Sequence, residues 1–209
     1  MDKDQLRNLY LSGKSVSQVA RTLNCSIHKV VYWMDVYGIS RRSRSAAGYL
    51  QHNPNGDPFK IKRKLSPSEK FLKGVGLGIY WGEGTKTTKY SLRVANTDPA
   101  VIKVFREFLR HICLVREDKI TYSIVSFNDT DPEVSRSYWS KQLGILPTKF
   151  GKITIIPKQG KGTYKKKSAF GVCTIQLSNI KLRSWVMGEL ENIQKSLVSS
   201  TAERALGKG

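Results

Sequence analysis

Apolar residues near the start of the chain recur at helical spacing and are interrupted by turn residues. The pattern predicts three short helices within residues 2–40, separated at Gly13 and Asn24. Ser15 and Ser26 stand directly before the second and third helices, where side-chain oxygens cap free backbone N–H groups. The inner face of the third helix is predicted to consist of Val30, Trp33, Met34 and Tyr37.

A second set of elements begins at Ser66. Ser66 to Glu69 has the form of a capping box with proline at the first helical position, and the helical pattern continues to about Gly82. The remaining elements alternate between strand and helix patterns. Strands are predicted at 89–97, 119–127, 150–157 and 169–177, and helices at 99–113, 133–145 and 180–197.

The order of these elements predicts an α+β protein. Its parts are a three-helix domain at 1–40, a basic and partly flexible linker at 41–65, a larger mixed domain at 66–197, and a flexible tail at 198–209. We expect the last two strands to pair around a lysine-rich loop. A pattern of strand, polar cap and amphipathic helix occurs at 92–109 and again, with weak residue similarity, at 174–193. This repetition indicates that the region from Asp131 onward forms a second helix–hairpin–helix half.

The net charge of the chain indicates the class of its partner. The chain has a formal net charge of +20, from 36 Lys and Arg against 16 Asp and Glu. A surplus of this size indicates a polyanionic partner, most commonly nucleic acid and more rarely an anionic membrane. We expect no membrane segment, since no uncharged apolar run is long enough and the first residues lack a signal-peptide core. The three widely separated cysteines favour a reducing, cytoplasmic location.

The second and third predicted helices have a short turn between them. Their sequence, VSQVARTLNCSIHKVVYWMDVYGIS, resembles the helix-turn-helix of resolvase- and regulator-type DNA-binding domains. That resemblance implies that the third helix enters the major groove. The alternative is a plain three-helix protein-interaction module. The outward residues expected to contact DNA are Ile27, His28, Lys29, Val31 and Tyr32.

Two runs of basic residues in the linker, and one residue beyond it, are further candidates for phosphate contacts. The candidates are Arg41, Arg42, Arg44, Lys60, Lys62, Arg63, Lys64 and Lys86.

Three glycines recur every four residues in FLKGVGLGIYWGEGTK, at Gly74, Gly78 and Gly82. On a helix they form one bare stripe, although each interior glycine costs about 0.5–1 kcal/mol relative to alanine. Close packing of a second helix on the stripe would compensate. Glu83 follows at the helix end, where the helix dipole disfavours an acid. The alternatives are a tightly packed core helix without a site and an exposed helix-end acid.

The segment GLGIYWGEG resembles the signature helix of the LAGLIDADG homing endonucleases. Gly78 matches the inner glycine of the motif, Gly82 its small residue and Glu83 its penultimate acid; Trp81 stands where an earlier acid can occur. The resemblance covers residues 66–195. It implies a saddle-shaped domain in which two signature helices pack together, each contributes a carboxylate to sites for Mg2+, and the sheets contact double-stranded DNA. Glu83 is thus the implied catalytic and metal-binding residue.

Only one signature helix is present in the chain, which leaves alternatives open. Two chains could pair as a homodimer through the helix at 67–82 and bring two Glu83 residues together. Alternatively, the chain is a monomer with a degenerate second half, as in a related family of regulators that bind DNA without cutting it. A third class is an RNA-binding or RNA-processing protein, because charge alone does not separate RNA from DNA.

A lysine-rich segment at 147–167 contains seven lysines and no acid. We expect it to contact phosphates, with Lys149, Lys152 and Lys158 best placed because they flank or lie within a strand. Phe150, Tyr164 and Phe170 could stack on bases, although core packing is favoured for Phe170.

Overall fold

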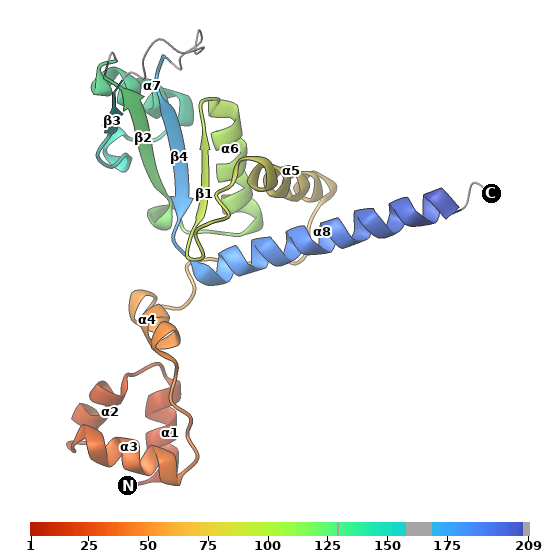
Figure 1. Cartoon of the computed structure of the whole chain (residues 1–209). Coiled ribbons are helices and arrows are strands. Elements are labelled where there is room, and N and C mark those ends of the chain that lie inside the picture. The colour runs from red at the N-terminus through yellow and green to blue at the C-terminus, as the bar shows by residue number, and fades with distance from the viewer. Residues whose placement is uncertain (129, 158–168, 207–209) are drawn as a thin grey trace. The chain divides into compact units, whose positions relative to one another are not determined.

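The protein folds into two compact units, Met1–Pro58 and Phe59–Gly209. The computed structural model describes residues 1–128, 130–157 and 169–206 (Figure 1). Within these residues, helices accompany a four-stranded mixed sheet, so the predicted α+β class is confirmed.

The N-terminal unit contains the three predicted helices. They pack around a small apolar core, and Val30 and Met34 of the third helix are fully buried in it, as expected. Trp33 and Tyr37 are partly buried against the same core. The helices of this unit are α1 (Lys3–Leu11), α2 (Val16–Thr22), α3 (Ile27–Val36) and a fourth, α4 (Arg44–His52).

Local signals account for the boundaries of α2 and α3. Ser15 and the Gln18 side chain form a reciprocal capping box at the start of α2, and the Ser26 hydroxyl accepts a hydrogen bond from the Lys29 N–H. Asn24 adopts a left-handed φ of 46° in the turn between the two helices. Asparagine tolerates this conformation, which is how so short a turn is made.

The predicted linker at 41–65 is more ordered than expected. It contains α4, and the boundary between the units follows Pro58. Phe59 and Ile61 pack against the core of the second unit, and the backbone N–H groups of Lys60 and Lys62 donate to the carbonyls of Cys113 and Ile112. Residues 59–65 therefore belong to the second unit.

The second unit begins its regular structure with the predicted capped helix. Ser66 and Glu69 form the capping box. The helices are α5 (Pro67–Glu83), α6 (Pro99–Glu107), α7 (Pro132–Leu143) and α8 (Ile180–Leu206). A π-helical turn (Phe108–Ile112) continues α6, and two 3-10 turns lie at Glu117–Lys119 and Pro147–Lys149. The strands are β1 (Leu92–Asn96), β2 (Thr121–Phe127), β3 (Thr154–Ile156) and β4 (Val172–Leu177).

The sheet order is β1-β4-β2-β3. The expected pairing of the last two strands is wrong, because β3 pairs in parallel with β2 while β4 lies antiparallel between β1 and β2. The region from Asp131 onward thus completes the same sheet, and a separate second half is not formed. One more extended segment joins the edge, since Gly84 bridges to Val94 of β1.

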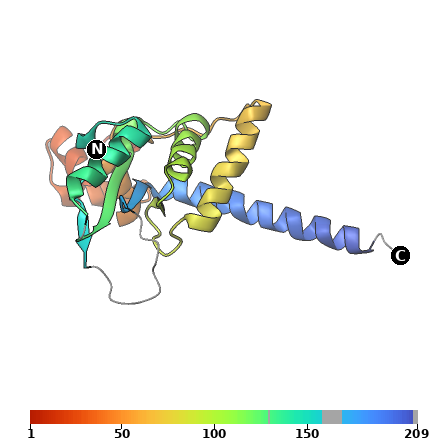
Figure 2. The ribbon, with the colours of Figure 1, turned by 90° about the horizontal axis from the view of Figure 1, so that it is seen from above.

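Alternate strand residues point into a core that α6 and α7 cover from one side (Figure 2). Leu92, Ile124 and Ile175 are fully buried there, with Phe105 of α6 and Trp139 of α7. The opposite face ranges from buried Thr174 through half-buried Ser123 and Gln176 to exposed Thr121. The sheet therefore has one helix-covered face and one face that mixes polar and apolar side chains.

The last helix is longer than expected. Residues 198–206 of the predicted flexible tail continue α8, which extends beyond its packing against α5 (Figures 1 and 2). Lys73 of α5 and Glu189 of α8 form an ion pair at 2.6 Å where the two helices meet.

Candidate functional site

The outer surface of α3 carries large exposed side chains. Ile27 is 48% exposed, and Tyr32, whose ring meets Trp33 edge-on, is 61% exposed. His28 and Lys29 are also exposed, and Val31 is half-buried. The structure thus brings the five predicted α3 residues together on one outward surface.

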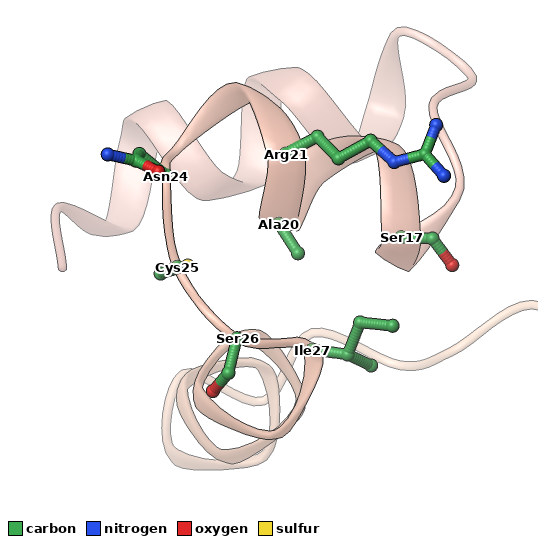
Figure 3. A pocket seen from close by; sticks show the side chains of 7 residues that line it. All are labelled: Ser17, Ala20, Arg21, Asn24, Cys25, Ser26 and Ile27. Atoms are coloured by element: carbon green, nitrogen blue, oxygen red, sulfur yellow. The ribbon is translucent and has the colours of Figure 1, made fainter.

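A shallow depression lies where α2 meets the start of α3 (Figure 3). It adds side chains that the sequence reasoning missed, because Ser17 and Arg21 of α2 are exposed beside Ile27. Helical spacing could have predicted these two residues, because Ser17 and Arg21 are one helical turn apart and face away from buried Val19. A hydroxyl, a guanidinium and an apolar side chain thus lie together at the edge of the α3 surface.

The arginines of the first basic run, residues 41–44, differ in their contacts. Arg41 and Arg44 are exposed. Arg42 instead lies over the Tyr10 ring, 4.1 Å from its centroid, and donates to the carbonyls of Tyr10 and Lys14. Its predicted role in phosphate binding therefore competes with a structural role, which is to fasten the chain after α3 to the three-helix core.

The second basic run is divided in the same way. Lys60, Arg63 and Lys64 are exposed, whereas the Lys62 ammonium lies 2.5 Å from the Glu69 carboxylate. The hydrogen bond from Lys62 lowers the pKa of Glu69, and a backbone hydrogen bond from Ser66 lowers it further. Lys62 therefore stabilises the start of α5, and this contact competes with the phosphate contact predicted for it.

The glycine stripe of α5 faces open space within one chain. A Cβ atom added at Gly74, Gly78 or Gly82 would meet no atom within 4 Å in the part of the chain that the structure describes. The same side of the helix exposes Phe71 (74%) and Trp81 (43%). The tight packing of α5 is made instead by Gly76, where a Cβ would lie 2.3 Å from Phe108.

Glu83 is exposed at the last position of α5, and the chain directly after it is held firmly. Gly84 passes so close to the α5 backbone that a Cβ there would lie 2.3 Å from the Tyr80 carbonyl oxygen. The Lys86 ammonium donates to the Trp81 carbonyl, and the Lys86 carbonyl accepts from Arg183 at 2.9 Å. Lys86, predicted as a phosphate contact, thus also compensates the negative end of the α5 dipole.

One chain does not assemble a complete metal site among its described residues, which contain no cluster of three or more His, Cys, Asp or Glu side chains. The donor that is present fits Mg2+, because this ion prefers carboxylate oxygens and is commonly held by one or two carboxylates with water and phosphate oxygens. Glu83 supplies one such carboxylate at an exposed position.

The sheet face opposite α6 and α7 carries polar side chains in register. Arg93 of β1 lies opposite Gln176 of β4, which lies opposite Thr121 of β2. Ser123 occupies the next position on the same face. The sequence analysis did not select these residues individually. The alternation of side chains along each strand would have placed them on one face of the sheet.

The two described lysines of the lysine-rich segment lie at the β3 edge of the sheet. Lys149 and Lys152 are exposed on either side of Phe150 and Gly151, which pair with Tyr122 of β2. Phe150 is buried against Tyr122, so stacking on a base is not its role.

Three predictions for this segment concern Phe170, Lys158 and Tyr164. Phe170 stacks on Tyr138, with ring centroids 3.8 Å apart, in agreement with the favoured packing role. Lys158 and Tyr164 lie outside the described residues.

None of the described helices combines the length and the apolar character required to cross a membrane. Comparison with known protein families, curated proteins and solved structures found no match to this chain.

Proposed function

We propose that this protein is a double-stranded DNA-binding protein in which α2 and α3 act as a helix-turn-helix. The support is the exposed α3 surface that contains Ile27, His28 and Tyr32, on a unit whose core is already filled from the other side of the helix. A major groove about 12 Å wide accepts one α-helix with its side chains. Arg21, at the edge of this surface, is suited to the phosphates beside the groove.

We further propose that the second unit is a Mg2+-dependent DNA endonuclease of LAGLIDADG type, and that it acts as a homodimer. The observation that carries this proposal is the open glycine stripe of α5, bordered by Phe71 and Trp81 and ended by Glu83. Bare backbone next to exposed aromatic side chains fits a second helix better than water. Pairing of two α5 helices around a two-fold axis would bring two Glu83 carboxylates to one place.

The sheet face opposite α6 and α7 supports the same proposal. Arg93, Gln176, Thr121 and Ser123 place hydrogen-bonding groups on this face, and Lys149 and Lys152 lie at its edge. In this function, Glu83 would hold Mg2+, which when bound activates water and stabilises the leaving oxygen. Lys86 and Arg183 hold the backbone on either side of Glu83, through hydrogen bonds to the carbonyls of Trp81 and Lys86.

The test is cleavage of a plasmid library in Mg2+, beside DNA binding measured in Ca2+. Wild type is expected to cut, whereas Glu83→Gln is expected to bind duplex DNA and not to cut. Affinity should fall steeply with added salt, because binding releases counterions from the phosphates. If Glu83→Gln cuts as well as wild type, the assigned acid is wrong; binding that is indifferent to salt would contradict the nucleic-acid proposal altogether.

A second candidate function is a transcriptional regulator that binds DNA without cutting it. The observation that favours it is that the described residues, Glu83 included, form no group of three or more His, Cys, Asp or Glu side chains that could hold a metal ion. The same assay separates the two candidates. Tight binding of wild type to one duplex site, with no cleavage of any library member in Mg2+ or Mn2+, would establish the regulator.

A further inference from the structure

Helix α8 is longer than the core that it covers. It has 27 residues, and Leu190 is the last of its described side chains that is buried. Ile193 still packs partly against the core, whereas residues 194–199 are exposed. Residues 194–199 are called the α8 arm below.

The arm continues the apolar spacing of the packed part of α8. Val186, Leu190, Ile193 and Leu197 recur every three or four residues, so they lie along one side of the helix. Val186 and Leu190 are buried in the core, whereas Leu197 is 54% exposed. Ser199 lies on the opposite side of the helix from Leu197. The side of α8 that packs inside the chain therefore continues into the arm as an exposed apolar side.

The arm extends past α5 on the side of the glycine stripe. Gly76 of α5 packs against Phe108, directly after α6, and Gly74 and Gly78 lie on the opposite side of the helix from Gly76. The stripe therefore faces away from α6. Helix α8 crosses α5 and continues on the side away from α6 (Figures 1 and 2). A helix that packed on the stripe would lie beside the arm.

The arm is long enough to cross such a helix. Helices α5 and α8 meet at the ion pair between Lys73 and Glu189. Ser199 lies ten residues beyond Glu189, which is about 15 Å along an α-helix. The axes of packed helices are about 8–10 Å apart. Phe71, which borders the stripe within one turn of Lys73, is 74% exposed and lies at the level of the arm.

The charge of the segment argues against DNA as its partner. Residues 184–199 contain two acids, Glu189 and Glu191, and one base, Lys195. Their net charge of −1 contrasts with the formal net charge of +20 of the whole chain. A segment without a basic surplus is not attracted to a polyanion. An apolar side next to the open stripe instead fits a protein surface.

We propose that the α8 arm of each chain packs on α5 of a second copy, with Leu197 against the partner's Phe71. The two arms of a two-fold dimer would then hold the paired α5 helices from both sides. This inference rests on the α5 pairing in the proposed function and adds a second contact to it.

Analytical ultracentrifugation of two matched variants tests the arm. Leu197→Glu places a charge on the apolar side of the arm and should raise the dimer dissociation constant about tenfold. Ser199→Glu adds the same charge on the opposite side and should leave the constant unchanged. Circular dichroism of both variants should match wild type, because both positions are exposed. Equal dissociation constants for Leu197→Glu and wild type would overturn the proposal.

A double-mutant cycle tests the contact across the dimer. Phe71→Ala and Leu197→Ala should each raise the dissociation constant about fivefold, and the double variant should raise it by clearly less than the product of the two factors. Such coupling is expected only for side chains that meet in the dimer. Two effects that simply multiply would show that Leu197 does not meet the partner's Phe71, and would overturn the proposal.

The outcomes separate the arm from the α5 pairing on which it rests. If wild type stays monomeric at every concentration, the proposed homodimer fails and the arm fails with it. If wild type dimerises, and Gly78→Leu prevents this while Leu197→Glu does not, only the arm fails. If Leu197→Glu dimerises as wild type does but binds duplex DNA more weakly, the arm contacts DNA and the assigned partner is wrong.

Discussion

Helices α3 and α5 are both exposed along one side, but the two sides are opposite in character. Helix α3 presents protruding side chains, including Ile27 and Tyr32, whereas α5 presents the bare backbone of Gly74, Gly78 and Gly82. A helix that enters a groove needs side chains that reach the bases, and a helix that meets another helix closely needs their absence. Under the proposed function, the α3 surface is complete in one chain, whereas the α5 surface would be covered by a second copy.

The largest effect should come from filling the bare face of α5. Gly78→Leu is expected to weaken self-association about a hundredfold or more, because a bulky side chain between two packed helices costs several kcal/mol in clash and lost contact. Cleavage should be lost with the dimer, while the circular dichroism and unfolding temperature of the monomer stay unchanged. Analytical ultracentrifugation over a range of concentrations measures the dissociation constant.

Two other glycines serve as controls for Gly78→Leu. Gly188→Leu on α8 also adds a side chain where a Cβ meets no described atom, and should leave self-association unchanged. Gly76→Ala should affect the fold instead of self-association. Its Cβ would overlap Phe108 and should lower the free energy of unfolding by about 1–3 kcal/mol. If Gly78→Leu dimerises as well as wild type, the proposed α5 interface is wrong.

Removal of the N-terminal unit should have the next largest effect and should test the α3 side of the comparison. A chain that begins at Phe59 should stay folded, because residues 59–65 pack on the second core, but it should bind DNA more weakly and with broader site choice. The slope of log affinity against log salt should decrease by about one for each lost phosphate contact. Binding to a random-sequence duplex library measures both quantities. Unchanged site choice would assign α3 another role.

Much of the N-terminal unit could be predicted because its signals are local. Ser15, Asn24 and Ser26 each act within a few residues of their position, and the helical period of Val30 and Met34 selected the buried face correctly. Helix α4 was missed because composition outweighed its helical spacing. Clustered arginines, the interior Gly48 and the Asn, Pro and Gly residues at 53–56 are together typical of a linker.

The second unit was harder to predict because its arrangement depends on distant contacts. The strands were located from their alternation, but the insertion of β4 between β1 and β2 is a choice of partner that no single segment encodes. Gly76 was overlooked beside the regular stripe, although it is the glycine that packs within the chain. Likewise, the roles of Arg42 and Lys62 depend on Tyr10 and Glu69, which the charge pattern alone does not reveal.

The smallest effect concerns the start of α5 and its dependence on pH. The folded-state pKa of Glu69 is lowered from its ordinary value of 4.5, first by the hydrogen bond from Lys62. Its stabilising contribution is therefore present above the unfolded pKa and is lost as the pH falls through the folded pKa. Glu69→Gln should lower the urea midpoint slightly at pH 7, and the difference from wild type should vanish at strongly acid pH.

Glu191→Gln, at an exposed position of α8, serves as the control for Glu69→Gln and should match wild type at both pH values. A difference between Glu69→Gln and wild type that persists unchanged in strong acid would show that the Glu69 carboxylate charge is not responsible.

The central claim is that two copies of α5 bring two Glu83 carboxylates together, and mixed dimers test it most directly. Wild type and Glu83→Gln are mixed in varied ratios at constant total concentration, refolded together, and assayed for nicked and linear plasmid in Mg2+. The account predicts that double-strand cleavage falls as the square of the wild-type fraction and that nicked plasmid accumulates at intermediate ratios. Double-strand cleavage that falls in simple proportion to the wild-type fraction, without nicked product, would contradict it.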